Sequence, residues 1–270
     1  MNTLRISASS YSNTAPLVWS FLYGRGRGSV EIILDNAPAR SAELLSQGRV
    51  DAALVPVIAS QCIDGVRIVP GVCVGAKESV RSVCIVTNGQ KLDEVRSFSL
   101  DVSSRTSVAL TKIIFREFLG REPEWRDAPP DINAMLAASD AALLIGDPAL
   151  AISSGVDGSG QNYRVFDLVE LCKKHTGLGF VFAMWMTRHE RLSIDLAAAR
   201  DEGLAHLDEI AANYARDIGL SAKAMKAYLS ENISFSISKE MEEGLELYLD
   251  LAKKHGLTSE RQPLSFTETI

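Results

Sequence analysis

Hydrophobic positions near the start of the chain follow first the period of a strand and then that of a helix. Apolar and polar residues alternate over residues 4–8, which predicts a short strand. Residues 13–23 carry apolar side chains at helical spacing behind Ser12 and Asn13, which are residue types that begin helices. The same order then recurs as a strand, a helix and a buried strand over residues 30–34, 38–47 and 52–55.

A second strand–helix series follows two apolar, β-branched runs at residues 66–74 and 80–87. Its predicted strands are 98–102, 141–145 and 164–168, its predicted helices are 104–119 and 148–153, and a glycine-rich loop is expected at 155–160. The apolar run 180–186 predicts a strand that returns the chain to the first series. Helical patterns then cover residues 196–218, 221–231 and 238–256, where no motif suggests chemistry.

Repeated strand–helix alternation predicts parallel sheets with helices on their faces. The two series predict an α/β protein with lobe I at residues 1–86 plus 187–270, C-terminal helices included, and lobe II at residues 87–186. This order resembles the type II periplasmic-binding-protein fold, which implies a ligand cleft between the lobes with helix N-termini pointing into it.

Composition narrows the classes of function. The chain has 270 residues, of which 46% are hydrophobic and 23% charged, and its net charge is −6. A packed globular protein fits these values, whereas nucleic-acid binding proteins usually carry a basic surface. With no long apolar segment and no secretory signal pattern at residues 1–8, we expect a cytoplasmic protein without a membrane partner.

The four cysteines and four histidines are widely spaced. They form no cluster with metal-ligand spacing, so we expect no metal site and four reduced thiols. No serine, histidine and aspartate stand in the context of a nucleophile turn, and the glycines of segment 24–28 lack the spacing of a phosphate-binding loop. The sequence therefore gives no sign of covalent catalysis.

Two predicted helix starts, one in each lobe, are rich in small polar side chains. The first carries Tyr11, Ser12, Asn13 and Thr14, and the second carries Ser103, Ser104, Arg105, Thr106 and Ser107. Helix N-termini have unpaired N–H groups and a partial positive charge, so the pair could hold a dianion, with Arg105 as a further carboxylate contact. Simple helix capping, with Arg105 in solvent, remains the alternative.

Of two further groups of candidate residues, one follows a predicted strand and the other precedes one. Gly146 and Asp147 come after the apolar strand 141–145, where α/β sheets often place ligand-facing loops, and Asp147 could be a base, a ligand contact or a helix cap. Thr176 and Gly177 precede the strand 180–186, where glycine would let the backbone approach a ligand. The aromatic residues beside them are more typical of a core.

These groups, in this order, resemble the chorismate dehydratase family of the futalosine route of menaquinone biosynthesis. The matching residues are Asn13, Thr14, Pro16, Leu17, Leu45, Gly48, Asp51, Val80, Ser82, Val83, Ser104, Thr106, Ser107, Ile145, Gly146, Asp147, Ala149, Leu150, Thr176, Gly177, Leu178, Phe180, Val181, Phe182, Ala183 and Trp185. Two positions depart from the family's pattern: Gly179 replaces a usual proline, and Cys172 a common tryptophan.

The resemblance implies removal of water from chorismate to give 3-[(1-carboxyvinyl)oxy]benzoate without a cofactor. It implies catalytic roles for Asn13 and Ser82, which would orient the enolpyruvyl group and the departing hydroxyl. Substrate contacts are expected from Tyr11, Thr14, Ser104, Arg105, Thr106, Ser107, Gly146, Asp147, Thr176 and Gly177. The ring proton would go to the substrate's own enolpyruvyl carboxylate or to Asp147.

Two alternatives share the expected fold. Dihydroxynaphthoate synthase of the same pathway is expected to use a histidine base, and this sequence has none before His175. A non-catalytic protein that binds small anions would have the same architecture. The sequence leaves monomer and homodimer equally open.

Overall fold

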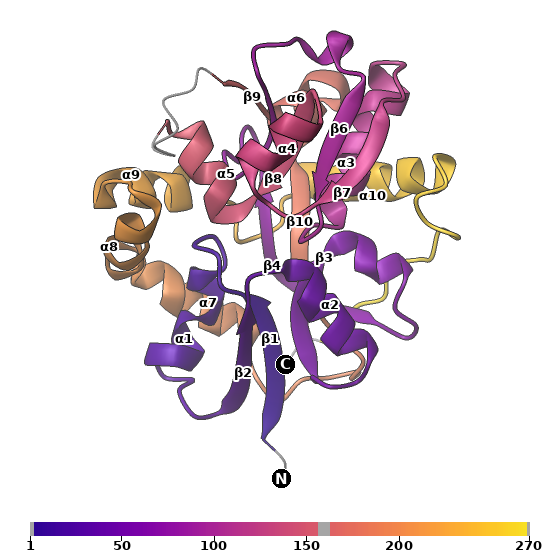
Figure 1. Ribbon diagram of the computed structural model, residues 1–270. Helices are drawn as coiled ribbons and strands as arrows, with labels where there is room; N and C mark the ends of the chain where they lie inside the picture. The colour runs from indigo at the N-terminus through magenta and orange to yellow at the C-terminus, as the bar shows by residue number, and fades with distance from the viewer. Residues whose placement is uncertain (1–2, 156–162, 269–270) are drawn as a thin grey trace.

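The strands of the protein form two five-stranded sheets. The computed structural model describes residues 3–155 and 163–268. The first sheet has the order β2-β1-β3-β10-β4, with β1 at Leu4–Ser9, β2 at Val30–Asp35, β3 at Ala52–Pro56, β4 at Arg67–Ala76 and β10 at Phe180–Thr187. The second has the order β7-β6-β8-β5-β9, with β5 at Val83–Thr87, β6 at Ser97–Asp101, β7 at Glu124–Ala128, β8 at Ala141–Ile145 and β9 at Arg164–Asp167. The chain thus forms two α/β lobes, one above the other in Figure 1.

The chain passes between the two sheets twice. The first crossing lies between β4 and β5, and the second lies between β9 and β10. The strand at residues 83–87 therefore belongs to the second sheet and the strand at 180–187 to the first, so both differ from the expected boundaries at 86 and 186. We accordingly propose lobe boundaries a few residues earlier, at 77–82 and 177–179.

The sheets are mixed, so the expectation of parallel sheets is wrong for two strands. β10 pairs antiparallel with β3 and β4, and β5 pairs antiparallel with β8 and β9. Each of these strands enters its sheet directly from the other lobe, without a helical crossover that would reverse its direction. The remaining pairs, such as β1 with β2 and β6 with β8, are parallel as expected.

Helices cover both sheets and enclose the central strands. They are α1 (Ala15–Tyr23), α2 (Pro38–Ser46), α3 (Thr106–Ile113), α4 (Ile132–Ala138), α5 (Gly146–Ser153), α6 (Leu168–Thr176), α7 (Leu196–Ala205), α8 (Leu207–Ile218), α9 (Ala222–Ala227) and α10 (Lys239–Lys254). Every residue of β3, β5 and β8 is buried. Burial on both faces explains why these strands are continuous apolar runs in the sequence.

Several elements differ from the expected ones. The single helix expected over residues 196–218 is two helices, α7 and α8, that meet at His206. β7, α4 and α6 lie where no element was expected. Of the glycine-rich loop expected at 155–160, residues 156–160 lie outside the described part of the chain. Within that part, no helix is both long enough and apolar enough to span a membrane.

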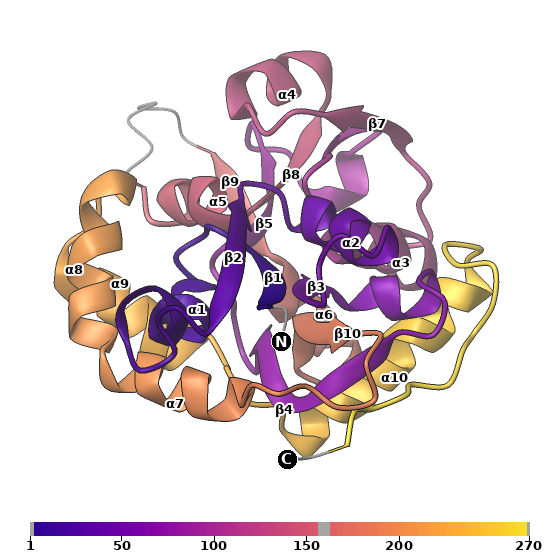
Figure 2. The same cartoon turned by 90° about the horizontal axis from the view of Figure 1, so that it is seen from below.

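The C-terminal helices connect the two lobes. α8 contacts α1 of the first lobe and α5 of the second, and α10 contacts both β10 and α3. Figure 2 shows α7 to α10 around the outside of the first sheet. The contact of α10 with the second crossing is close, because a Cβ atom at Gly244 would lie 2.1 Å from the carbonyl oxygen of Gly179.

Candidate active site

A cavity lies between the lobes, at the ends of the strands. Its empty space is about 560 Å³, open solvent at its mouth included, which is within the roughly 300–1,000 Å³ typical of small-molecule pockets. Hydroxyl, phenol and amide groups line it from both lobes: Ser9, Tyr11, Asn13, Thr14, Ser104, Thr106 and Ser107. The other lining residues are Gly146 and apolar side chains such as Leu54 and Phe182. No lysine, arginine or histidine is among the described residues that line it, so an anion there would be held by neutral donors.

The first-lobe wall of the cavity is the junction between β1 and α1. Thr14 is the N-cap residue of α1, and its side chain makes no capping hydrogen bond. The Thr14 hydroxyl instead pairs with the hydroxyl of Ser9 at 2.7 Å. The capping alternative therefore does not account for the polar side chains at this junction. They remain available to the cavity or to the other lobe.

Tyr11 covers this end of the cavity. Its burial raises the pKa of the phenol to about 12, and the charges of Asp101 and Asp147 add to the rise while a hydrogen bond to Ser103 opposes it. The phenol is therefore protonated at neutral pH and can donate a hydrogen bond.

Gly146 lies directly beside Tyr11. Its φ is +67°, and a Cβ atom at this position would lie 2.6 Å from the Tyr11 ring. Only glycine allows this backbone conformation and this close approach together. Gly146 therefore shapes the cavity and orients Tyr11.

The second-lobe wall is the start of α3, whose N-cap is Arg105. The hydroxyl of Ser104 accepts from the backbone N–H of Ser107 at 3.3 Å, which is a local capping contact. The hydroxyl of Thr106 accepts from the backbone N–H of Ile58 in the first lobe at 3.4 Å. These side chains line the cavity as expected, and each also has one structural partner.

Asn13 and Ser82, the two residues expected to be catalytic, lie close to each other. The Asn13 Nδ2 atom is 3.5 Å from the Ser82 Oγ atom, and Asn13 lines the cavity. Ser82 is fully buried between two lining residues, Val80 and Val83. The phenol of Tyr228, from the C-terminal helices, donates to the Ser82 Oγ atom at 2.8 Å. Nothing in the sequence pattern indicated Tyr228, because it sits in an ordinary amphipathic segment.

Asp147 and Arg105 bridge the lobes and do not line the cavity. Asp147 accepts from the hydroxyl of Ser12 at 2.5 Å and from the Ser12 backbone N–H at 3.1 Å. Burial raises the pKa of the Asp147 carboxyl above its ordinary value, and the hydrogen bonds from Ser12 oppose that rise. Arg105 forms an exposed ion pair with Glu43 of α2 at 3.4 Å. Both side chains already have partners in the first lobe.

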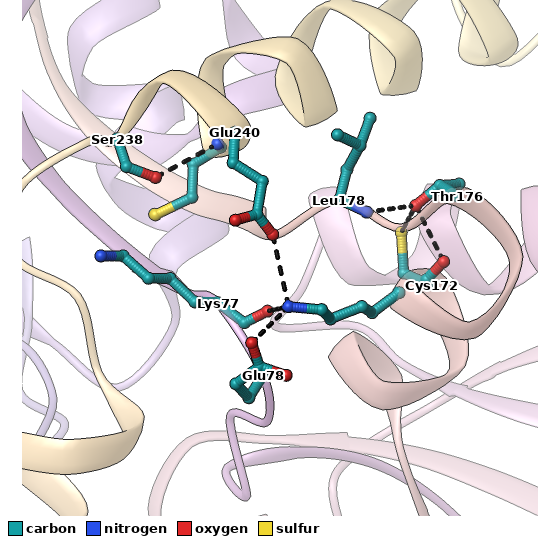
Figure 3. Close-up of polar contacts among 9 residues, drawn as sticks. Lys77, Glu78, Cys172, Thr176, Leu178, Ser238 and Glu240 are labelled. Carbon is teal, nitrogen blue, oxygen red and sulfur yellow. Dashed lines mark hydrogen bonds and ion pairs between the residues drawn. The ribbon is translucent and has the colours of Figure 1, made fainter.

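Thr176 and Gly177 end α6 and are not among the cavity residues. The Thr176 hydroxyl donates to the carbonyl of Cys172 at 2.9 Å and accepts from the N–H of Leu178 at 3.1 Å. Gly177 takes a left-handed conformation at the helix end, with φ +75°. Figure 3 shows Thr176 and Leu178 at the second crossing, opposite Lys77 and Glu78 of the first. Their sequence motif therefore reflects how the chain turns back to the first lobe.

Lys173 ties the two crossings to α10. Its amine donates to the carbonyl of Lys77 at 3.2 Å and forms ion pairs with Glu78 and with Glu240, the latter at 3.4 Å. These contacts fix the crossings beside the start of α10.

Among residues 3–155 and 163–268 no three histidine, cysteine or acidic side chains are grouped so that they could hold a metal ion. The cysteines in this part are free thiols. Burial raises the pKa of the Cys73 thiol to about 12, which leaves it protonated and unreactive.

Comparison with known proteins identifies the family. A family model described as menaquinone biosynthesis matches residues 4–254. The chain belongs to this family. Among curated proteins, it is 32% identical over 236 residues to the chorismate dehydratase of Thermus thermophilus. The matched region covers 81% of this chain and 84% of the relative.

Solved structures similar to this chain share its fold at low sequence identity. The alkanesulfonate-binding protein SsuA of Xanthomonas axonopodis, bound to MOPS, has a TM-score of 0.66 at 15% identity and covers 96% of this chain and 94% of its own. A Candida albicans protein described as having the generic periplasmic binding protein fold has a TM-score of 0.60 at 11% identity, with 100% and 99% covered. The two-lobed, periplasmic-binding-protein-like fold expected from the sequence is therefore confirmed.

Proposed function

We propose that this protein is a chorismate dehydratase, a hydro-lyase that converts chorismate to 3-[(1-carboxyvinyl)oxy]benzoate in menaquinone biosynthesis. The observation that carries the proposal is the cavity, in which donors from both lobes surround an otherwise apolar space. Chorismate has two carboxylates and a hydroxyl on an apolar ring, so its chemistry matches such a lining. Membership of the menaquinone-biosynthesis family supports the same substrate.

The proposed reaction needs orientation more than it needs a strong catalytic group. Loss of the ring proton and the ring hydroxyl makes the ring aromatic, so the elimination is strongly favourable. A site that holds the substrate in a reactive conformation and excludes water supplies most of what remains. We therefore propose that no metal or organic cofactor takes part.

We propose that Ser104, Thr106 and Ser107 hold the ring carboxylate, where the start of α3 adds a partial positive charge. Tyr11 and Thr14 would line the opposite side. Asn13 and Ser82 would bind the departing hydroxyl and orient the enolpyruvyl group, since both carry hydrogen-bond donors, Asn13 in the cavity wall and Ser82 directly behind it.

The base in this proposal is the enolpyruvyl carboxylate of the substrate. The carboxylate of Asp147 already accepts hydrogen bonds from the hydroxyl and the backbone N–H of Ser12 across the cleft, so it is poorly placed to reach a ring proton. The enolpyruvyl carboxylate takes the ring proton, the bond between the ring and its hydroxyl group breaks as the ring becomes aromatic, and the same proton passes to the leaving hydroxide to give water. Overall, no proton is gained or lost.

Two alternatives predict different observations. Dihydroxynaphthoate synthase chemistry would need a histidine base, and the described cavity wall contains no histidine. A small-anion binding protein would bind chorismate and release it unchanged. As a biosynthetic enzyme the protein would work in the cytoplasm.

Purified protein, treated with EDTA and dialysed, should be incubated with chorismate and followed by mass spectrometry. The expected result is loss of one water and formation of 3-[(1-carboxyvinyl)oxy]benzoate. Chorismate that stabilises the protein against heat but is not converted would identify a binding protein. Turnover that returns only when a divalent metal is added back would contradict the cofactor-free mechanism.

A further inference from the structure

Tyr228 is a fully buried tyrosine whose hydroxyl group contacts Ser82 behind the wall of the candidate site. It begins the short π-helix Tyr228–Asn232 that follows α9, and its side chain has no solvent exposure. Its phenol donates to Ser82 Oγ at 2.8 Å, across 146 residues of sequence. Packing alone would be served by phenylalanine, and a buried hydroxyl is costly unless it is paired. The hydroxyl therefore calls for a role beyond filling the core.

The hydrogen bonds at Ser82 define that role. A serine hydroxyl accepts up to two hydrogen bonds and donates one. Tyr228 donates to this oxygen at 2.8 Å, and the amide of Asn13 approaches it at 3.5 Å. With its acceptor sites facing these two groups, Ser82 has its own hydrogen left to donate. The available protein acceptor is the Val80 carbonyl at 3.3 Å, a long contact for an O–H donor.

The protonation state of Tyr228 is consistent with a fixed donor. Burial raises the pKa of its phenol well above the ordinary value, and hydrogen bonds from the site, with Ser82 the larger and Asn13 the smaller, oppose the rise. The phenol is therefore neutral over the whole range in which the protein would work. A neutral phenol keeps its proton and directs it at Ser82.

We infer that Tyr228 is a positioning residue for the proposed dehydration: it occupies an acceptor site of Ser82, so that the Ser82 hydroxyl donates toward the departing hydroxyl of the substrate. This inference rests on the proposed function. It gives the C-terminal helices, which carry no motif in the sequence, a part in the chemistry. Tyr228 itself does not touch the substrate.

The test is a double-mutant cycle between Tyr228→Phe and Ser82→Ala, with chorismate turnover as the readout. Tyr228→Phe keeps the ring and removes one oxygen, so its fold, checked by circular dichroism and melting temperature, should be retained. We expect kcat to fall about 10- to 100-fold, with KM changed by less than about twofold, because orientation is lost while binding groups remain. In the Ser82→Ala background, Tyr228→Phe should then change kcat by less than about twofold.

Tyr248→Phe is the matched control. Tyr248 is also buried, and its phenol donates to the backbone carbonyl of Thr106 at 3.1 Å, away from Ser82. Whatever effect this variant has should be the same with and without Ser82. A Tyr228→Phe effect that persists in full in the Ser82→Ala background would show a structural role and overturn the inference, as would unchanged turnover in the single variant. Absence of turnover in the wild-type protein would overturn the proposed function itself, and this inference with it.

Discussion

Ser12 and Asn13 are adjacent in the chain, yet their side chains belong to two different regions of the cleft. Asn13 belongs to what we call the floor, in which Asn13 lines the cavity and Ser82 and Tyr228 lie behind it in one hydrogen-bonded group. Ser12 belongs to the rim, where its hydroxyl donates to Asp147 of the other lobe at 2.5 Å. Two further rim contacts join the lobes: Arg105 with Glu43, and the N–H of Ala39 with the carbonyl of Ser103 at 3.2 Å.

This difference separates two kinds of effect. Rim groups have partners in the protein, so changing them should alter how readily the lobes close and therefore mainly KM. In the floor, the donors of Asn13 and Ser82 make only long contacts within the protein, at 3.5 and 3.3 Å, so changing floor groups should alter the chemical step and therefore kcat. Substitutions in the floor and in the rim test whether the two regions affect kcat and KM separately.

Asn13→Ala should reduce kcat by about 10²- to 10³-fold, the usual cost of removing one donor aimed at developing charge. Steady-state kinetics with chorismate would measure it. Asn36→Ala is the control, because the side chain of Asn36 is exposed and accepts a hydrogen bond from Ser10 outside the cavity, and it should leave kcat unchanged. Asp147→Asn should lower kcat by less than about tenfold. If Asp147→Asn proved more damaging than Asn13→Ala, Asp147 would be the base and the division between rim and floor would fail.

Gly146→Ala should damage both stability and activity. Alanine at this position would keep a strained, left-handed φ of +67°. Its Cβ atom would also lie 2.6 Å from the Tyr11 ring, which would have to move. Strain alone costs about 1–3 kcal/mol, and displacement of Tyr11 should add a loss of turnover. Gly120→Ala is matched in backbone, with φ +61°, but has no atom within 4 Å of its Cβ position. Thermal unfolding should show both variants destabilised, whereas assays should show lost activity only for Gly146→Ala.

Arg105→Ala and Glu43→Ala should have small and equal effects. Their ion pair spans the lobes at 3.4 Å, but both side chains are over 40% exposed, and exposed pairs contribute about 0–1 kcal/mol. KM should rise by less than about fivefold in each variant, and the double variant should be no worse than either alone. If Arg105 instead binds a substrate carboxylate, Arg105→Ala would raise KM far more than Glu43→Ala.

The sequence predicted the fold class and most of the polar residues of the cavity wall, because these depend on local pattern. Strand–helix alternation indicated two α/β lobes, and polar residues at helix starts indicated the lining at Asn13, Thr14, Thr106 and Ser107. Whether these residues contact substrate stays a prediction. The hydrophobic pattern did not predict features that depend on which strands pair in space. The direction of β5 and β10 depends on how each enters its sheet, which hydrophobic periodicity does not encode.

The hydrogen-bond partners of individual side chains could not be predicted from the sequence either. Nothing local distinguishes Asp147, which Ser12 holds across the cleft, from an acid that faces a ligand. Thr176 and Gly177 have the residue types of a ligand loop, but they form the end of α6. Tyr228 reaches Ser82 because the π-helix Tyr228–Asn232 packs against the first crossing, a contact between residues 146 positions apart.

The smallest expected effect concerns the ionisation of Asp147. Burial raises its pKa in the folded protein, so folding favours the protonated form. Its contribution to stability is therefore fully present below the ordinary aspartate value of 3.8 and is lost as the pH rises through the folded pKa. Asp147→Asn does not titrate and should not lose this contribution. The melting temperature of the variant should therefore rise relative to that of the wild type as the pH increases from about 4 to about 7. A difference in melting temperature that does not change with pH would mean that the hydrogen bonds from Ser12 fully offset the cost of burying the Asp147 charge. The contact between Ser12 and Asp147 would then hold the lobes together as well at neutral pH as at acidic pH.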